Sequence, residues 1–236
     1  MCENDVILGV TADGVFAEYF VAPEKALTKI PQDLPADIAV FAEPVNCVMG
    51  AVNKIRLLPG ETVLVLGAGP IGLYFVMLLK SNGAGKVIVS EPSEYRAKYA
   101  LECGADVVIN PIKEDLSQKV KELTQGLGAD VTVDAVGVLS PDAIACTRRA
   151  GKIVLFGQNG AVTEKICQND ITRNGLTVYG NYIGLYSMTP TVKMLSSDLL
   201  PLEKIITHRL PLEDFGKGLE AMRKGEALEV VLYPQK

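Results

Sequence analysis

Thr62-Val-Leu-Val-Leu-Gly-Ala-Gly-Pro-Ile-Gly72 is the stretch of sequence that decides the fold. Its first five residues are apolar or β-branched and contain no breaker, which is typical of a fully buried parallel strand. Gly67, Gly69 and Gly72 follow at G-x-G-x-x-G spacing, and the apolar run 73–80 predicts a helix after them. Glycines in such a unit allow a tight turn, a close approach of the backbone to a pyrophosphate, and close packing of helix on strand. The helix N-terminus adds free N–H groups for an anion.

A second predicted strand, 86–90, is followed at once by Glu91, which lies 19 residues after Gly72. A dinucleotide-binding unit places an acidic residue about 20 residues further on, where it accepts hydrogen bonds from the adenosine ribose. A carboxylate there also repels a 2′-phosphate, so it favours NAD over NADP. Arg96 is near enough in sequence to soften that preference, unless it is simply solvated on its helix. The alternative is a doubly wound fold that binds another ligand or none.

Composition excludes several classes of function. The chain has 236 residues, is 48% hydrophobic and 22% charged, and carries a formal net charge of −5. No cluster of basic residues appears, which argues against nucleic acid or a membrane as a partner. No apolar run is long enough to span a bilayer, and no signal peptide opens the chain. The five cysteines include no C-x-x-C pair, so a reducing cytoplasm is expected rather than a disulfide framework.

Strands and helices alternate through the middle of the chain. This rhythm predicts an α/β fold, a doubly wound parallel sheet of six strands with right-handed crossovers. The predicted strands are 62–66, 86–90, 107–110, 130–134, 152–156 and 176–179, and the helices between them are 73–80, 95–102, 116–123 and 141–149.

The two ends of the chain follow a different pattern. Before the glycine loop we expect short strands at 15–21 and 25–30, then helices at 33–42 and 44–55 with Pro44 at the first helical position. After about residue 182 we expect a helix, a strand, a second helix and a last strand that are not another unit of the same sheet. These are 190–200, 205–210, 212–224 and 228–232.

Several collinear segments together resemble the zinc-type medium-chain dehydrogenases, with the polyol branch (sorbitol, butanediol and threonine dehydrogenases) the best match. The resemblance covers essentially the whole chain, which makes it more specific than any single motif. Its segments are Leu8-Gly-Val, Asp13-Gly-Val-Phe-Ala-Glu-Tyr19, Ala42-Glu-Pro44, Val63 to Gly72, Val87 to Arg96, Val133-Asp-Ala-Val-Gly137, Leu155-Phe-Gly-Gln158, Ile206-Thr-His-Arg-Leu-Pro211 and Gly225 to Val231.

The resemblance implies three parts: a partial GroES-like catalytic domain at 1–45, an NAD-binding Rossmann domain at 46–182, and a return to the catalytic domain at 183–236. It also implies that most of the catalytic domain lies upstream of this sequence. Cys2 matches the last cysteine of a four-cysteine structural zinc lobe whose other three have no counterpart here. The first catalytic zinc ligands of the family, a cysteine and a His-Glu pair, are also missing.

The same resemblance implies cofactor-binding residues in two groups. The first is the glycine loop, where Gly67, Gly69, Pro70, Ile71 and Gly72 would hold the pyrophosphate and Ile71 would pack against the nicotinamide, with Glu91 on the ribose. The second is a set of strand ends beside the nicotinamide ring, whose alternative is ordinary strand termini: Val136, Gly137, Phe156 and Gln158.

Glu43 is the one metal-site candidate. The resemblance makes it a ligand, or near-ligand, of catalytic zinc, whereas the alternative is a carboxylate favoured by a helix dipole. Catalytic zinc needs three protein ligands and an open position, so we expect this chain not to hold zinc. His208, the only histidine, is expected to be structural. The resembled family often has a basic residue near the pyrophosphate where this chain has Glu229, so cofactor binding should be weaker. It commonly has histidine or tyrosine where this chain has Gly50, so the nicotinamide side should be more open.

The expected function is therefore the cofactor-binding portion of a zinc-dependent NAD(H) oxidoreductase. In an intact relative, zinc would polarise a secondary alcohol or polyol, and hydride would pass to the nicotinamide to give a ketone. This fragment is expected to be inactive. The alternatives are a short non-catalytic protein that binds NAD or forms dimers, and a methyltransferase, which also uses a glycine loop. The strand at 176–179 is expected to pair with a twin chain in a homodimer or homotetramer.

Overall fold

The computed structural model describes residues 6–234 and divides the chain into two compact units. One unit is Phe41–Pro201, and the other combines Met1–Val40 with Leu202–Lys236. The three-part division with boundaries after residues 45 and 182 remains a prediction. Within the described residues, no helix is both long enough and apolar enough to cross a membrane.

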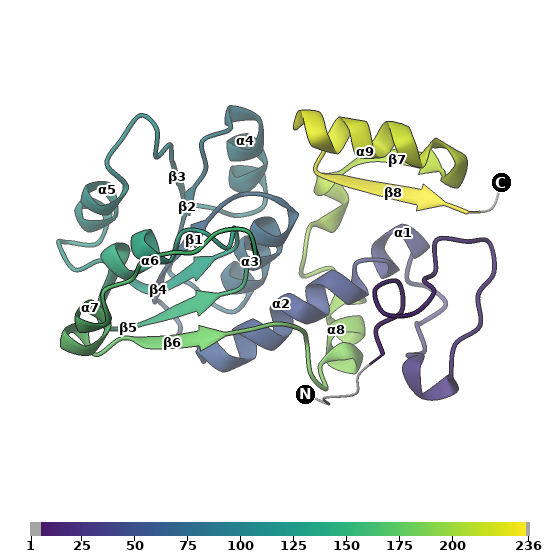
Figure 1. The fold of residues 1–236 in the computed structure, drawn as a ribbon, viewed down its shortest axis with the longest axis horizontal. Helices are drawn as coiled ribbons and strands as arrows, with labels where there is room; N and C mark the ends of the chain where they lie inside the picture. The colour runs from purple at the N-terminus through teal and green to yellow at the C-terminus, as the bar shows by residue number, and fades with distance from the viewer. Residues whose placement is uncertain (1–5, 235–236) are drawn as a thin grey trace. The chain divides into compact units, whose positions relative to one another are not determined.

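A six-stranded parallel sheet forms the centre of the larger unit, in the order β3-β2-β1-β4-β5-β6 (Figure 1). The prediction of a doubly wound Rossmann sheet is therefore confirmed. Val63 on β1 pairs with Val87 on β2 on one side and with Val131 on β4 on the other. The strand order reverses between β1 and β4, where such sheets open a crevice for ligands. The strands are β1 (Thr62–Leu66), β2 (Lys86–Ser90), β3 (Val107–Ile109), β4 (Ala129–Asp134), β5 (Thr147–Leu155) and β6 (Thr177–Gly180).

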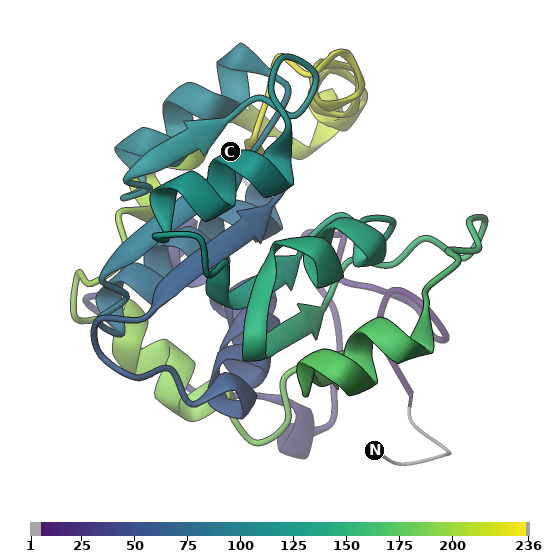
Figure 2. The same ribbon diagram turned by 90° about the vertical axis from the view of Figure 1, so that its left-hand side faces the viewer.

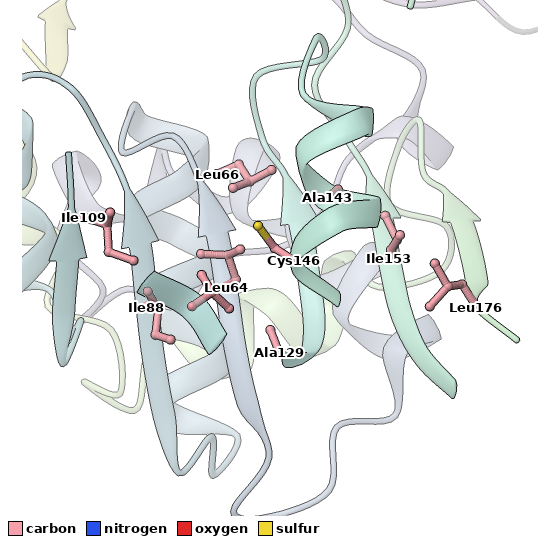
Figure 3. Close-up of a cluster of buried hydrophobic side chains, with 10 residues drawn as sticks. Leu64, Leu66, Ile88, Ile109, Ala129, Ala143, Cys146, Ile153 and Leu176 are labelled. Atoms are coloured by element: carbon pink, nitrogen blue, oxygen red, sulfur yellow. The ribbon is translucent and has the colours of Figure 1, made fainter. Parts of the chain in front are cut away.

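Helices cover both faces of this sheet because the strands are apolar on both sides. On one face, Leu64, Leu66 and Ile88 form a buried cluster with side chains from α5 and α6 (Figure 3). Figure 2 turns this face, with α5, α6 and α7, toward the viewer. On the other face α3 packs against β1 and β2, α2 packs against β5 and β6, and the two helices contact each other. The helices are α2 (Ala42–Ile55), α3 (Pro70–Ser81), α4 (Glu94–Glu102), α5 (Leu116–Leu123), α6 (Ser140–Cys146), α7 (Gln168–Asn174) and α8 (Met188–Leu195).

Two helix starts differ from the prediction for reasons that concern proline. The helix after the glycine loop begins at Pro70 instead of residue 73, because Gly69 is its N-cap and proline suits the first helical position. Pro44 is the third residue of α2 and not the first as expected. It is tolerated there because the N–H groups of the first turn have no partner within the helix.

Two elements beyond α6 also differ from the prediction. Helix α6 ends at Cys146, and β5 begins at Thr147 instead of residue 152, because Thr147 already pairs with Ala129 ahead of a register shift. Helix α7 was not predicted, since its sequence Gln-Asn-Asp-Ile-Thr-Arg-Asn has no apolar stripe. The available signal was Gly175, which ends the helix in the left-handed conformation with φ 60°.

The smaller unit contains a separate two-stranded parallel sheet, as expected of a tail that does not extend the main sheet. Strands β7 (Ile206–Pro211) and β8 (Glu229–Tyr233) are joined by η3 (Leu212–Asp214) and α9 (Phe215–Lys224). Gly218 on α9 lets the helix lie close to β8, since a Cβ there would be 2.7 Å from a methyl group of Val230.

The predicted strands at 15–21 and 25–30 are wrong. Neither segment pairs with a neighbour among the described residues, and the one regular element there is the short 3₁₀ turn η1 (Glu24–Ala26). Alternation is a property of one segment, but a strand also needs a partner for its backbone hydrogen bonds. The helix expected at 33–42 is reduced to α1 (Ala36–Ala39). Val21 is 97% exposed, and the ring of Phe16 packs edge-on against that of Phe215, with 5.4 Å between centroids.

Candidate functional site

A cavity of about 470 Å³ opens at the carboxyl edge of the sheet, where β1, β2 and β4 end. It brings together eight of the predicted site residues, from the glycine loop, from the end of β2 with the start of α4, and from the loop after β4. These are Gly67, Gly69, Pro70, Ile71, Gly72, Glu91, Arg96 and Val136. Five further residues of its lining were not predicted: Ser90, Pro92, Pro111, Ala135 and Leu139. Four of these, Ser90, Pro92, Pro111 and Ala135, end a strand or closely follow one. They could have been predicted, because ligands bind at the carboxyl ends of the strands in such a sheet.

The three glycines of the loop meet different surroundings. Gly67 has φ +93°, a left-handed conformation that favours glycine, and a Cβ there would lie 2.6 Å from a methyl group of Val136. A Cβ on Gly72 would overlap the carbonyl oxygen of Gly67 and lie 2.9 Å from its carbon. A Cβ on Gly69 would meet nothing within 4 Å. Gly67 and Gly72 are therefore required by the fold, while the space beside Gly69 is left open to the cavity.

Glu91 connects the end of β2 to the glycine loop. Its side chain is buried, with 4% of the residue exposed. One carboxylate oxygen accepts a hydrogen bond from the Ala68 N–H at 2.7 Å, and the other accepts one from the Ser93 N–H at 2.9 Å. An ionised carboxylate has about four acceptor positions, so each oxygen retains capacity for one more donor. A pair of hydroxyl groups in the cavity would fit that capacity.

Arg96 brings the opposite charge to the same cavity. It lies in the first turn of α4, where its N–H donates to the Ser93 hydroxyl at 3.4 Å. Its side chain is half-buried and lines the cavity near Glu91. Within residues 6–234, no carboxylate forms an ion pair with its guanidinium group. The cavity therefore presents one fixed acceptor and one cation.

Asp134 holds the third wall of the cavity in place, and the sequence analysis did not identify it. It ends β4 and is 2% exposed. One carboxylate oxygen accepts from the N–H groups of Val136 and Gly137 at 2.9 and 2.8 Å, and the other accepts from Leu139 at 3.0 Å. Three N–H donors satisfy the buried charge and fix the loop after β4. The available signal was an acidic residue at the carboxyl end of a predicted strand.

Three predicted residues lie at the ends of β4 and β5 but do not line the cavity. Gly137 packs against the backbone of the segment after β5, since a Cβ there would be 2.7 Å from the Gln158 nitrogen. Phe156 packs edge-on against the ring of Phe75, with 5.1 Å between centroids. Gln158 is exposed. Their role beside a nicotinamide ring remains a prediction.

Glu43 is exposed on the first turn of α2. It is hydrogen-bonded to Cys47, a residue of a type that can bind metals. The Cys47 thiol donates to its carboxylate at 3.5 Å. Burial raises the pKa of Cys47, and the charge of Glu43 adds to the effect. In the part of the chain that the structure describes, no three His, Cys, Asp or Glu side chains are placed to hold a metal. These residues do not fit a catalytic zinc ion, which needs three protein ligands.

Three of the remaining predicted positions lie in helices or strands. Gly50 does not open a pocket as expected, because a Cβ there would lie 2.9 Å from the Gly184 Cα, so this glycine serves close packing. His208 lies on β7 with its ring nitrogen 3.0 Å from the Thr207 hydroxyl. Glu229 lies on β8, and its effect on a cofactor remains a prediction. Cys2 lies outside the described residues.

The family model described as zinc-binding dehydrogenase matches residues 70–197. The erythritol/L-threitol dehydrogenase of Mycolicibacterium smegmatis is 35% identical over 99% of this chain and 66% of its own length. An L-threonine 3-dehydrogenase of Caldanaerobacter subterraneus subsp. tengcongensis is 37% identical over 99% of this chain and 69% of its own length. This chain thus spans about two thirds of the length of these relatives.

Two solved structures share the fold. A zinc-binding dehydrogenase from Sinorhizobium meliloti, bound to NADP, superposes with a TM-score of 0.92 at 26% identity, covering 99% of this chain and 70% of that one. An alcohol dehydrogenase from E. coli CFT073, in complex with NADH, superposes with a TM-score of 0.90 at 30% identity, covering 96% of this chain and 68% of that one.

Proposed function

Because this chain belongs to the zinc-binding dehydrogenase family, we propose that it is the NAD-binding portion of an oxidoreductase that acts on a secondary alcohol or a polyol. The observation that carries the proposal is the cavity at the carboxyl edge, where the glycine loop, Glu91 and the loop after β4 meet. A dinucleotide in a doubly wound sheet binds at this switch point.

Each part of the cavity has a proposed role. The pyrophosphate lies against the open side of Gly69, where the N-terminus of α3 offers unpaired N–H groups and a partial positive charge. The adenosine ribose donates its two hydroxyl groups to the free acceptor positions of Glu91. Glu91 is already fixed by two N–H donors, so little ordering is needed on binding.

We propose NAD instead of NADP because the Glu91 carboxylate would face a 2′-phosphate and repel it. Arg96 lines the same cavity and opposes this preference. Both cofactors occur among the similar solved structures, since one contains NADH and another contains NADP. The preference is therefore a balance between one acidic and one basic side chain.

Substrate oxidation requires more than this cavity. The described residues do not fit a catalytic zinc, so we propose that the chain as given binds cofactor without oxidising alcohol. The alternative is a non-catalytic protein that binds NAD or forms dimers. We further propose that β6, which ends the sheet order and is mostly exposed, pairs with a second copy in a homodimer or homotetramer, and that the protein works in the cytoplasm.

The test is a titration that follows the fluorescence of NADH itself, since the sequence has no tryptophan to report binding. We expect saturable binding that is abolished in Glu91→Ala and unchanged in Glu94→Ala. Glu94 is a matched control, because its exposed carboxylate pairs with Lys113 at 2.9 Å and does not line the cavity. Circular dichroism of both variants checks folding. Tighter binding of NADPH would overturn the cofactor preference, and full binding by a folded Glu91→Ala variant would overturn the site.

A further inference from the structure

A second cavity of about 470 Å³ lies away from the proposed cofactor site. Its walls come from the end of α5, from α6, from the start of β5 and from the segment that leads into α7. All strands of the main sheet are parallel, so the start of β5 lies at the edge opposite to the strand ends that line the first cavity. The two cavities share no lining residue.

The lining of this second cavity is basic, although the chain as a whole carries a net charge of −5. Lys121, Arg149 and Lys165 contribute three cations, and Asp170 is the one acidic residue in the lining. Within the described part of the chain, no hydrogen bond or ion pair involves the side chain of any of the three cations. With three cations and one carboxylate, the lining has an excess of positive charge, which favours a positive potential at the concave surface.

Apolar side chains complete the walls, among them Leu127, Ile144 and Ile166. The volume is within the range of small-molecule sites, about 300–1,000 Å³. Three cations are too few for a nucleic acid backbone, which calls for an extended basic surface. Arginine can bind a carboxylate or phosphate with two parallel hydrogen bonds, and lysine acts as a point charge beside it.

We propose that this cavity binds a small organic anion with at least two negative charges, of the phosphate ester or polycarboxylate class. The anionic groups pair with Lys121, Arg149 and Lys165, and the carbon skeleton packs on the apolar wall. Helix α6 lies between the two sites: Leu139, its N-cap residue, lines the cofactor cavity and Ile144 lines the anion cavity.

Cys167 supplies a local reporter for this proposal. It lines the cavity and is exposed, whereas Cys47 is half-buried and Cys103 and Cys146 are buried. Burial raises the pKa of Cys146 to about 12, which keeps that thiol unreactive at neutral pH. Peptide mapping by mass spectrometry assigns each modification, and Cys167→Ser confirms the assignment.

The first measurement compares two thiol reagents at Cys167, the dianion 5,5′-dithiobis(2-nitrobenzoate) and the neutral 2,2′-dithiodipyridine. The ratio of their rate constants should fall about fivefold in the triple variant Lys121→Gln, Arg149→Gln, Lys165→Gln, because three screened charges no longer attract the dianion. The triple variant Lys25→Gln, Lys29→Gln, Lys193→Gln changes the net charge equally at exposed positions elsewhere. It should leave the ratio unchanged.

The second measurement tests occupancy. Citrate and fructose 1,6-bisphosphate are each added at millimolar concentration, and the alkylation of Cys167 by neutral iodoacetamide is followed. One of the two anions should slow alkylation at least fivefold in the wild type and not in the first triple variant, and which one does so distinguishes carboxylate from phosphate ester. Glucose should have no effect. An unchanged reagent ratio, or no protection by either anion, would overturn the proposal.

Discussion

The substitutions Gly72→Ala and Gly69→Ala separate the part of the glycine loop that folds from the part that binds. The methyl group added at Gly72 would overlap the carbonyl oxygen of Gly67, a backbone atom that cannot rotate away. Overpacking of this kind costs about 1–3 kcal/mol, and backbone contact places it at the upper end. For a protein of this size, about 3 kcal/mol lowers Tm by roughly 6–12 °C.

Gly69→Ala should behave in the opposite way. Gly69 has φ −67° and ψ 176°, which any residue adopts, and its Cβ would meet nothing within 4 Å. Removing glycine from an unstrained position stabilises a protein by about 0.4–1 kcal/mol, through the unfolded state. The same methyl group occupies the space proposed for the pyrophosphate. We therefore expect Kd for NADH to rise at least tenfold, which corresponds to about 1.4 kcal/mol.

Both variants are measured by differential scanning calorimetry without cofactor and by NADH titration. The expected pattern is a lower Tm for Gly72→Ala, and an unchanged or slightly higher Tm with weak binding for Gly69→Ala. If Gly69→Ala bound NADH as tightly as the wild type, the cofactor would not lie against this loop. If Gly72→Ala kept its Tm, the contact between Gly72 and Gly67 would not constrain the fold.

Three further outcomes follow from the structure. Elemental analysis should find far less than one zinc per chain; stoichiometric zinc would contradict the conclusion drawn from Glu43 and Cys47. Light scattering should show a dimer or tetramer, and Val178→Lys, which places a charge on the exposed edge strand β6, should give a monomer; a monomeric wild type would refute the pairing. Burial alone would raise the pKa of Asp106, but hydrogen bonds from Lys80 and the Val87 N–H outweigh it and hold this pKa below its ordinary value. A carboxylate with a lowered folded pKa stabilises above its unfolded pKa of about 3.9 and loses this contribution as pH falls through the folded value. Asp106→Asn should therefore lower Tm at pH 7, with a difference that shrinks below about pH 4; a difference independent of pH would show that charge is not involved.

Much of the main sheet could be predicted from sequence because its signals are local. The buried strands 62–66 and 86–90, the glycine spacing and Glu91 each depend on a few adjacent residues. Parallel strands then bring their carboxyl ends together, which is why eight separately predicted residues line one cavity.

Other features depend on neighbours that a sequence pattern does not reveal. The segments at 15–21 and 25–30 alternate like strands, but none of the described residues supplies a partner strand. Asp134 binds three N–H groups of its own loop, which becomes apparent once the chain turns back on itself. The sequence predicts open space beside Gly50, but the backbone of Gly184 occupies that space in the structure.

The strand order has a consequence for how the chain is made. Strand β1 is synthesised before β4, its neighbour on one side, and the paired residues Val63 and Val131 are 68 residues apart in the sequence. Until then a nascent chain can cover β1 only on the side of β2. Synthesis therefore leaves one side of the central strand without its final neighbour for about 3–14 seconds, at about 5–20 residues per second. Chaperone contact during translation is expected to be greatest in that interval.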